Sequence, residues 1–229
     1  IKLENDGSFV YTPRENKKGR DYFGYKAADA DGNLSQEATV IIKIEKPKKD
    51  VLYSDMRGRA DEYSAVLLSE KNIFTGEQIG GEYCFGPDKN VSRGEFLSMC
   101  MLISGKPLLE SAMKTGFADD ENIPSWMKGY VSTAAMCGVA GGGEYGEAFE
   151  AQTPVTKSEA ALMLDRAITV TTVSYIPLDE ALDADIAQAC ANLSACGVMD
   201  DAIGRNGEYL TRGEMARMLS AAIKLTENR

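Results

Sequence analysis

The chain has 229 residues, of which 44% are hydrophobic and 26% charged, a soluble globular balance in which no apolar run reaches the roughly 20 residues of a membrane span. Its net charge is −10, and residues 51–229 hold 15 basic against 26 acidic residues, which disfavours a nucleic-acid partner because an acidic body repels phosphate. Histidine is absent, which excludes Ser-His-Asp and Cys-His catalysis and removes the commonest zinc ligand.

Residues 1–45 are predicted to form β-strands. The segments 7–13 and 21–29 alternate aromatic with polar residues, and "ATVIIKI" at 38–44 is a run of mostly β-branched residues. "DADGN" at 29–33 is predicted to be a turn, since Asp-Gly supplies a tight bend. A calcium loop is the alternative interpretation, but the glutamate that closes an EF-hand is missing, so no metal site is expected here.

The next stretch, residues 46–52, is predicted to be an exposed linker because it is rich in charge and contains Pro47. From Val51 onward Ala, Leu and Met recur at helical spacing, and strand-like runs disappear. Because the chain starts without an initiator Met or a signal peptide, we expect it to be a piece of a larger polypeptide.

One local pattern occurs three times in this helical part, as "NVSRGEF", "PVTKSEA" and "YLTRGEM". In each copy a Ser or Thr suited to a helix N-cap is followed, three residues later, by a Glu that can bond back to the backbone N–H of the cap. These capping-box pairs are Ser92 with Glu95, Thr156 with Glu159, and Thr211 with Glu214. We therefore assign the glutamates to capping and not to acid catalysis.

A basic residue follows each cap, namely Arg93, Lys157 and Arg212. A cation in the first turn opposes the helix dipole by some tenths of a kcal/mol, and capping does not require it. Two explanations stay open from the residues alone: an ion pair within the protein, or a site that binds an anion.

A second shared piece lies upstream of each box. Three predicted helices end near Asn72, Gly138 and Gly197, which suit a left-handed C-cap. The repeating unit is thus a helix, a Gly-containing loop, a capping box and a second helix. Such repeats need neighbours to cover their apolar faces, so one compact helical body is expected.

The five cysteines form no CxxC pair. Four of them fall among helix-patterned residues and are predicted to be small buried core thiols, with one disulfide pair as the alternative. They are Cys100, Cys137, Cys190 and Cys196.

The repeating unit resembles the S-layer homology module of bacterial surface proteins. The likeness is carried by "YSD" at 53–55 and "FADD" at 117–120 as aromatic-x-Asp starts, by "FGPDKNVSRGEF" at 85–96, and by Trp126 as a helix opening. It implies a mainly α fold, a pseudo-threefold trio of modules at 53–105, 117–170 and 178–225.

Residues 1–45 resemble the later half of bacterial cadherin-like or immunoglobulin-like surface repeats, through "DGSFVYTP" and "GRDYFGYKAADADG". This resemblance implies a small antiparallel β domain that is part of a β-sandwich.

The modules depart from the family pattern in ways that make three equal sites unexpected. Ala60 and Asp185 stand where the middle module has Trp126, and that module carries Lys157 in place of arginine. Lysine lacks the two-pronged donor geometry that suits a carboxylate.

Trios of this family bind anionic secondary cell-wall polysaccharide, often pyruvylated, in grooves between modules, and the arginine of the box contacts the acidic sugar. The resemblance therefore implies a non-catalytic, cofactor-free anchor at the extracellular cell wall or S-layer. The implied ligand-binding residues are Arg93, Arg212, Lys157, Trp126, Asp55 and Asp119. For Trp126, packing in the core is the favoured interpretation of the residue itself, and a platform on which a sugar stacks is the alternative.

Two other functions remain as alternatives. A degenerate trio could act only as a structural spacer for an adhesive surface protein. A glycan hydrolase would need a paired acid and nucleophile in a cleft, for which the carboxylates Asp119, Asp120 and Glu121 are the candidates. A cluster in an acidic loop is usually solvated, so this interpretation is disfavoured.

Overall fold

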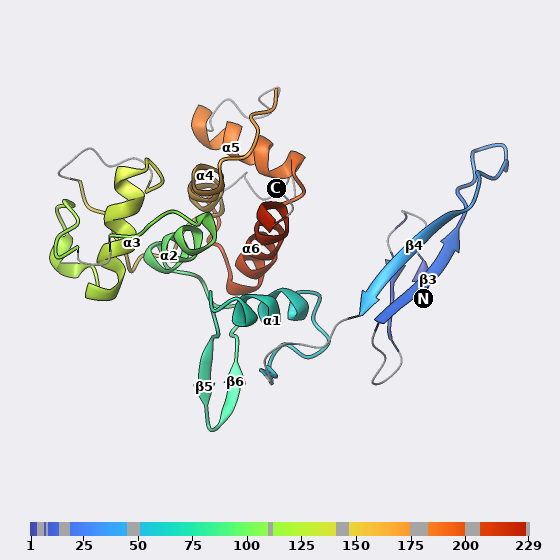
Figure 1. The fold of residues 1–229 in the computed structure, drawn as a ribbon, viewed down its shortest axis with the longest axis horizontal. Coiled ribbons are helices and arrows are strands. Elements are labelled where there is room, and N and C mark those ends of the chain that lie inside the picture. The colour runs from blue at the N-terminus through green and yellow to red at the C-terminus, as the bar shows by residue number, and fades with distance from the viewer. Residues whose placement is uncertain are drawn as a thin grey trace. The chain divides into compact units, whose positions relative to one another are not determined.

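The chain forms two compact units, Ile1–Lys48 and Lys49–Arg229, so the division falls within the predicted linker (Figure 1). Val51, near the end of that linker, is buried in the core of the second unit. The computed structural model describes residues 1–3, 7, 9–13, 19–44, 51–109, 112–140, 147–174, 183–199 and 207–227. Within these ranges, no helix is long and apolar enough to cross a membrane.

The N-terminal unit is antiparallel β, as predicted. Strand β1 (Lys2–Leu3) pairs with β2 (Phe9–Val10), and β3 (Gly19–Tyr25) pairs with β4 (Ala38–Ile44). The predicted strand at 38–44 is confirmed. The described strands form two separate two-stranded ladders.

The predicted turn at 29–33 is confirmed, and Asp29 organises it. Its Oδ1 accepts hydrogen bonds from the backbone N–H groups of Asp31 and Asn33, at 3.0 and 2.8 Å. A hydrogen bond from the side-chain amide of Asn33 lowers the pKa of Asp29 most, and the backbone hydrogen bonds lower it further. Gly32 adopts φ +84°, a left-handed conformation that glycine accepts without strain.

The second unit is helical over the described residues and carries one small hairpin. Its elements are α1 (Glu62–Glu70), β5 (Glu77–Ile79), β6 (Glu82–Cys84), α2 (Arg93–Ser104), the short 3₁₀ helix η1 (Asp120–Asn122), α3 (Ser125–Met136), α4 (Lys157–Ile168), α5 (Ala184–Ala195) and α6 (Arg212–Glu227).

Helices α1, α3 and α5 end in the same way. The predicted cap residues adopt φ +57°, +70° and +67°, respectively, at Asn72, Gly138 and Gly197. After α1, the N–H of Ile73 donates to the C=O of Leu68 at 2.9 Å, and an equivalent bond follows α3 and α5. This is the Schellman ending, in which a left-handed residue lets the chain satisfy carbonyls that the helix leaves open.

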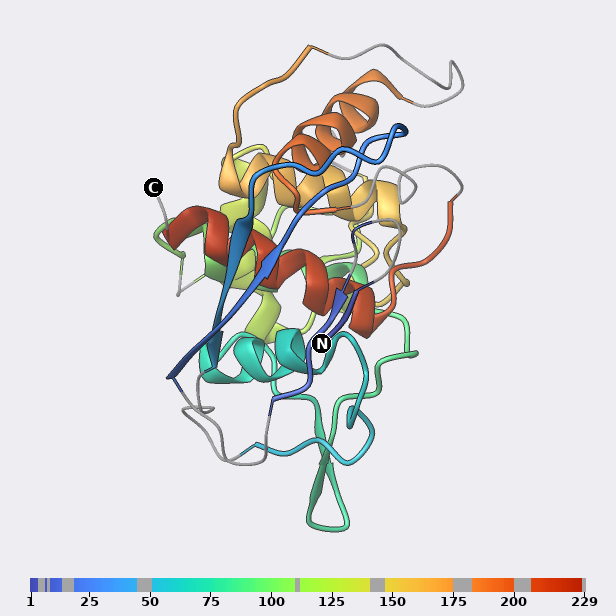
Figure 2. The ribbon, with the colours of Figure 1, turned by 90° about the vertical axis from the view of Figure 1, so that its right-hand side faces the viewer.

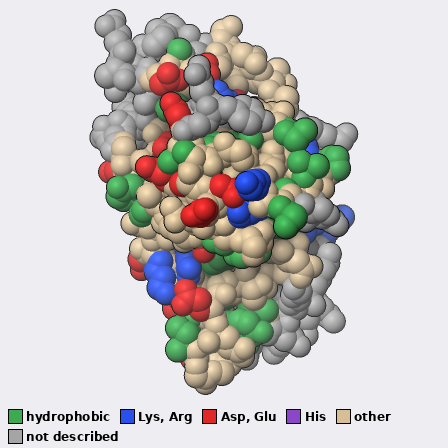
Figure 3. Space-filling model, turned by 90° about the vertical axis from the view of Figure 1, so that its left-hand side faces the viewer, with side chains coloured by type: hydrophobic (Ala, Val, Ile, Leu, Met, Phe, Trp, Pro, Cys, Tyr) green, Lys and Arg blue, Asp and Glu red, His purple; other side chains and the backbone are tan. Residues whose placement is uncertain are grey.

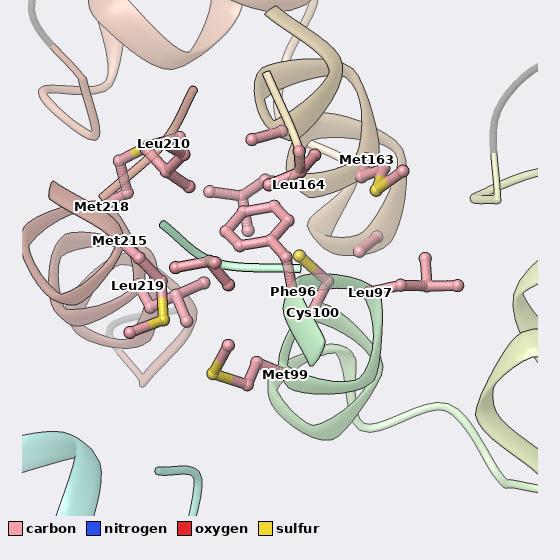
Figure 4. Close-up of a cluster of buried hydrophobic side chains, with 14 of the residues drawn as sticks. Phe96, Leu97, Met99, Cys100, Met163, Leu164, Leu210, Met215, Met218 and Leu219 are labelled. Atoms are coloured by element: carbon pink, nitrogen blue, oxygen red, sulfur yellow. The ribbon is translucent and has the colours of Figure 1, made fainter. Parts of the chain in front are cut away.

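The helices that follow the three boxes, α2, α4 and α6, share one core (Figure 4). Phe96 of α2, Leu164 of α4 and Met215 of α6 are completely buried there. Helix α2 contacts both α4 and α6. The expectation that the three box helices lie in one compact body is confirmed.

The first helix of each repeat packs chiefly on the box helix of the repeat before it. Helix α3 lies on α2. Helix α5 lies on α4, and α1 closes the cycle on α6 (Figure 2). Gly94 permits one of these approaches, since a Cβ there would stand 3.0 Å from the carbonyl oxygen of Ala151 and 2.6 Å from Sδ of Met127.

The expectation of buried cysteines holds only in part. All five lie within the described ranges and are free thiols there. Cys100 is buried in the shared core, but Cys190 and Cys196 are partly exposed and Cys137 is exposed. Cys137 immediately follows the last residue of α3, where the helix end faces solvent, so the helical pattern around it did not indicate burial.

Candidate functional site

The three capping boxes meet at their N-terminal ends and close a ring of backbone hydrogen bonds. The N–H of Val91 donates to the C=O of Leu210 at 3.0 Å, and the N–H of Leu210 donates to the C=O of Val155 at 2.9 Å. The N–H of Val155 returns to the C=O of Val91 at 3.0 Å. Each of these residues directly precedes a cap, so the ring fixes the starts of all three helices relative to one another.

A second ring ties each box to the segment that leads into the next box. The N–H groups of the three basic residues, Arg93, Lys157 and Arg212, each donate at 2.8 Å to a carbonyl of that segment. The acceptors are Thr153, Glu208 and Lys89, respectively. Each basic residue is thereby held at a junction between two successive repeats.

The predicted capping boxes are confirmed. In the first, the Oγ of Ser92 accepts from the N–H of Glu95 at 3.3 Å, and the Ser92 N–H donates to the Glu95 carboxylate at 3.1 Å. Thr156 with Glu159 and Thr211 with Glu214 make the same reciprocal pair. The box itself therefore satisfies two of the backbone donors at each helix start.

Two of the box glutamates, Glu159 and Glu214, also bind the basic residue of the preceding repeat, so each of these carboxylates has two structural tasks. Glu159 Oε2 accepts a hydrogen bond from the backbone N–H of Thr156, and Glu159 Oε1 accepts one from Arg93 Nη1 at 2.7 Å. Likewise, Glu214 Oε2 accepts a hydrogen bond from the backbone N–H of Thr211, and Glu214 Oε1 lies 2.7 Å from Lys157 Nζ in an ion pair. The ion pair across repeats, one of the two explanations left open for the basic residues, is present at both junctions.

The pKa values of these glutamates follow from the same contacts. Burial raises the pKa of Glu159, but the hydrogen bonds from Thr156 and the charge of Arg93 lower it by more, so the net shift is downward. The pKa of Glu214 is lowered in the same balance, with Lys157 as its cation. Both carboxylates are therefore ionised at neutral pH.

The third junction differs, because Arg212 pairs with a residue of the β5–β6 hairpin. Its Nη1 lies 2.8 Å from Oε1 of Glu77 and donates to the C=O of Phe85 at 3.2 Å. Lys89 Nζ contacts the same carboxylate, at 3.0 and 3.1 Å from its two oxygens. The position equivalent to Glu159 and Glu214 is Glu95, whose carboxylate receives both hydrogen bonds from its own cap, Ser92.

Aromatic rings hold the two arginines from another side. The guanidinium carbon of Arg93 lies 5.5 Å from the ring centroid of Phe149, and that of Arg212 lies 5.1 Å from the ring of Phe74. Contacts of this kind stabilise a cation by roughly 0.5–2 kcal/mol. The side chains of Arg93, Lys157 and Arg212 keep 17%, 14% and 12% of their surface exposed, respectively. Each therefore offers a small solvent-exposed area that a ligand can contact.

The two aspartates expected to bind ligand hold the backbone of the segment before each box. The carboxylate of Asp55 accepts from the N–H groups of Phe85 and Gly86 at 2.9 and 2.7 Å. That of Asp119 accepts from Phe149 and Glu150 at 2.7 and 2.8 Å. The equal spacing of 30 residues from aspartate to phenylalanine is a signal from which this role could have been predicted.

Trp126 is 58% exposed as the second residue of α3, so the favoured interpretation that it packs in the core is wrong. Ala60 and Asp185, which stand at the equivalent positions, are exposed as well. These exposed positions lie just before α1 and in the first turn of α3 and α5, and only the middle repeat has an aromatic ring there.

The acidic loop before α3 is fixed by internal contacts. Asp120 accepts from Lys128 Nζ at 2.7 Å and from the N–H and the hydroxyl of Thr115, also at 2.7 Å, and these bonds lower its pKa to about 2. A carboxyl group with this pKa is ionised near neutral pH and is a poor general acid. Both oxygens of Asp119 bind backbone N–H groups, and Glu121 is exposed.

Acidic and basic side chains lie next to one another in the centre of the face that Figure 3 shows. A scan against protein-family models found no match, and a search of curated proteins found no similar one. The likeness to S-layer homology modules therefore depends on the motifs of the chain itself.

Proposed function

We propose that this chain is a non-catalytic anchoring module that binds anionic, often pyruvylated, secondary cell-wall polysaccharide at the bacterial cell surface. In this proposal residues 53–105, 117–170 and 178–225 are three S-layer homology modules in a pseudo-threefold trio. Residues 1–45 are part of an immunoglobulin-like or cadherin-like surface repeat, and both parts belong to a larger surface polypeptide.

One observation carries the proposal: each box cation stands at a junction between two repeats, where the backbone rings hold it in place. Such a cation has a fixed position and a small exposed area, which suits recognition of a single carboxylate on a sugar. The exposed ring of Trp126 offers a flat apolar surface of the kind on which a sugar stacks.

The three junctions are expected to differ in strength. A guanidinium has five N–H donors, so Arg93 has the capacity to hold Glu159 and an acidic sugar together. The single ammonium group of Lys157 already contacts both Glu208 and Glu214, which leaves fewer N–H donors for a ligand. The Arg93 junction is therefore the strongest candidate site.

The structural spacer remains the second candidate, because the ion pairs favour it. Every box cation has a carboxylate partner from its own chain, and a bridge between repeats is a sufficient reason for its presence. The two functions differ in what removal of a cation does: a spacer loses stability alone, whereas an anchor also loses affinity for the glycan.

The experiment that tests the proposal is a titration of the protein with purified secondary cell-wall polysaccharide, in its native form and after mild acid removes its pyruvate. We expect binding to the native glycan, weaker binding to the glycan without pyruvate, and weaker binding at high salt because the contacts are partly exposed. Absence of binding to either glycan, with the protein folded, would contradict the proposal in favour of the spacer.

A further inference from the structure

Two cations converge on one carboxylate at the junction of α6 with the first repeat. Arg212 Nη1 lies 2.8 Å from Oε1 of Glu77, and Lys89 Nζ lies 3.0 and 3.1 Å from its two oxygens. The Glu77 carboxylate is ionised, because the hydrogen bonds from Arg212 and Lys89 lower its pKa. An arrangement of two cations on one carboxylate is a way to bind an acidic group.

The carboxylate belongs to a hairpin that only the first repeat shows within the described residues. Glu77 stands at the start of β5 opposite Cys84 of β6, and Gly80 and Gly81 turn the chain with φ +59° and +90°. The hairpin projects from the helical unit beside α1 (Figure 1). The Glu77 carboxylate forms the ion pair with Arg212. At the other two junctions the glutamate of the next box forms the equivalent ion pair.

Arg212 is held independently of Glu77. The C=O of Phe85 accepts from its Nη1 at 3.2 Å, and the ring of Phe74 lies 5.1 Å from the guanidinium carbon. Gly86 leaves the space that the side chain needs, since a Cβ there would stand 3.1 Å from Nη1. The cation is therefore kept in position when the carboxylate leaves, which is the condition for a preorganised anion site.

We infer that Arg212 and Lys89 form a binding site for the carboxylate of an acidic sugar, and that Glu77 of the same chain occupies this site as an internal competitor. An external carboxylate binds here only by displacing the Glu77 side chain. The inference rests on the proposed function for the identity of the sugar, and it adds Lys89 as a ligand-binding residue and Glu77 as the group that closes the site.

A tethered competitor lowers the apparent affinity of a site by the fraction of time for which the site is open. Glu77 keeps 42% of its side-chain surface exposed and Lys89 keeps 57%, so water reaches this ion pair and its strength is moderate. The junction is consequently a weaker site than that of Arg93 in the native protein, and it becomes stronger when Glu77 is removed.

The first test needs no glycan. Phenylglyoxal modifies accessible guanidinium groups, and mass spectrometry of peptides gives the rate at each arginine. We expect Glu77→Ala to accelerate modification of Arg212 about threefold, because the partly exposed ion pair no longer shields it. The matched variant Glu82→Ala removes an exposed carboxylate from the other strand of the same hairpin and should leave the rate unchanged.

Pyruvate serves as the probe for the carboxylate site. It should slow the modification of Arg212 in the Glu77→Ala variant, and additional replacement of Lys89 by Ala should remove most of this protection. The modification rate of Arg166, which lies in the last turn of α4 and pairs with Asp185 away from the boxes, is the internal standard in every sample. Equal Arg212 rates in Glu77→Ala and Glu82→Ala, or no protection by pyruvate, would overturn the inference.

Titration of the same variants with purified cell-wall polysaccharide separates this inference from the proposed function. A gain in affinity of about threefold for Glu77→Ala, with none for Glu82→Ala, supports both. Protection by pyruvate without any polysaccharide binding supports the carboxylate site and contradicts the proposed function. Polysaccharide binding by the native protein with no effect of Glu77→Ala in either assay supports the proposed function and overturns the inference.

Discussion

Replacement of Asp119 by asparagine distinguishes a residue that holds the backbone from one that binds glycan. The carboxylate accepts from Phe149 N–H at 2.7 Å through one oxygen and from Glu150 N–H at 2.8 Å through the other. Asparagine keeps the shape but has a single acceptor oxygen, and its amide NH₂ would face a second donor. One charge-assisted hydrogen bond is therefore lost without any change of volume.

A hydrogen bond to a charged group contributes about 1.5–3 kcal/mol, and 1 kcal/mol shifts the melting temperature by about 2–4 °C in a domain of this size. We expect Asp119→Asn to lower the melting temperature by roughly 3–12 °C, the smaller values reflecting partial exposure of the carboxylate. Glu121→Gln removes a neighbouring exposed carboxylate and is the matched control. Circular dichroism melting of both variants measures the difference.

The backbone role of Asp119 also predicts how polysaccharide binding responds to its replacement. At a temperature where Asp119→Asn is fully folded, its affinity for the polysaccharide should equal that of the native protein. If the variant melts together with Glu121→Gln but binds the glycan more weakly, Asp119 contacts ligand directly and the backbone role assigned to it is wrong.

Three further predictions concern the helical unit. Thr211→Ala should lower the free energy of unfolding by about 1 kcal/mol in urea titration, because it removes the acceptor for the Glu214 N–H; unchanged stability would show that Thr211 caps nothing. The pKa of Asp120 is lowered from 3.8 to about 2, so its stabilising contribution is complete above pH 3.8 and is lost as the pH falls toward 2. Lys128→Met should weaken this pH dependence of stability, and an unaltered pH profile of stability would refute the ion pair. A maleimide should label exposed Cys137 in the folded protein but buried Cys100 only after unfolding, since burial raises the thiol pKa and blocks access; early labelling of Cys100 by mass spectrometry would contradict the core assignment.

Features that depend on neighbours in the sequence could be predicted. The capping boxes and the left-handed helix ends involve residues within six positions of one another, and all of them are confirmed. The strand at 38–44 was predicted to the residue, because a β-branched run has no competing helical pattern.

Features that depend on the cyclic arrangement of the repeats could not be predicted. Arg93 and Glu159 are 66 positions apart, and nothing near either residue indicates that one caps a helix while binding the cation of another repeat. The ion-pair partner of Arg212, Glu77, lies in a segment that was predicted to be a loop, although "IGGE" at 79–82 carries the Gly-Gly signal of a tight hairpin. The exposure of Trp126 depends on which side of α3 packs on α2, which local pattern alone did not settle.

The most direct test of glycan anchoring is isothermal titration of Arg93→Ala with purified secondary cell-wall polysaccharide. Arg166→Ala is the matched control, because Arg166 carries the same charge in the last turn of α4 and pairs with Asp185 away from the boxes. A charge-assisted bond contributes about 1.5–3 kcal/mol, so Arg93→Ala should bind at least roughly tenfold more weakly while Arg166→Ala binds as the native protein does. Equal affinity of Arg93→Ala and Arg166→Ala, with a lower melting temperature for Arg93→Ala alone, would contradict anchoring through this junction and favour a purely structural ion pair.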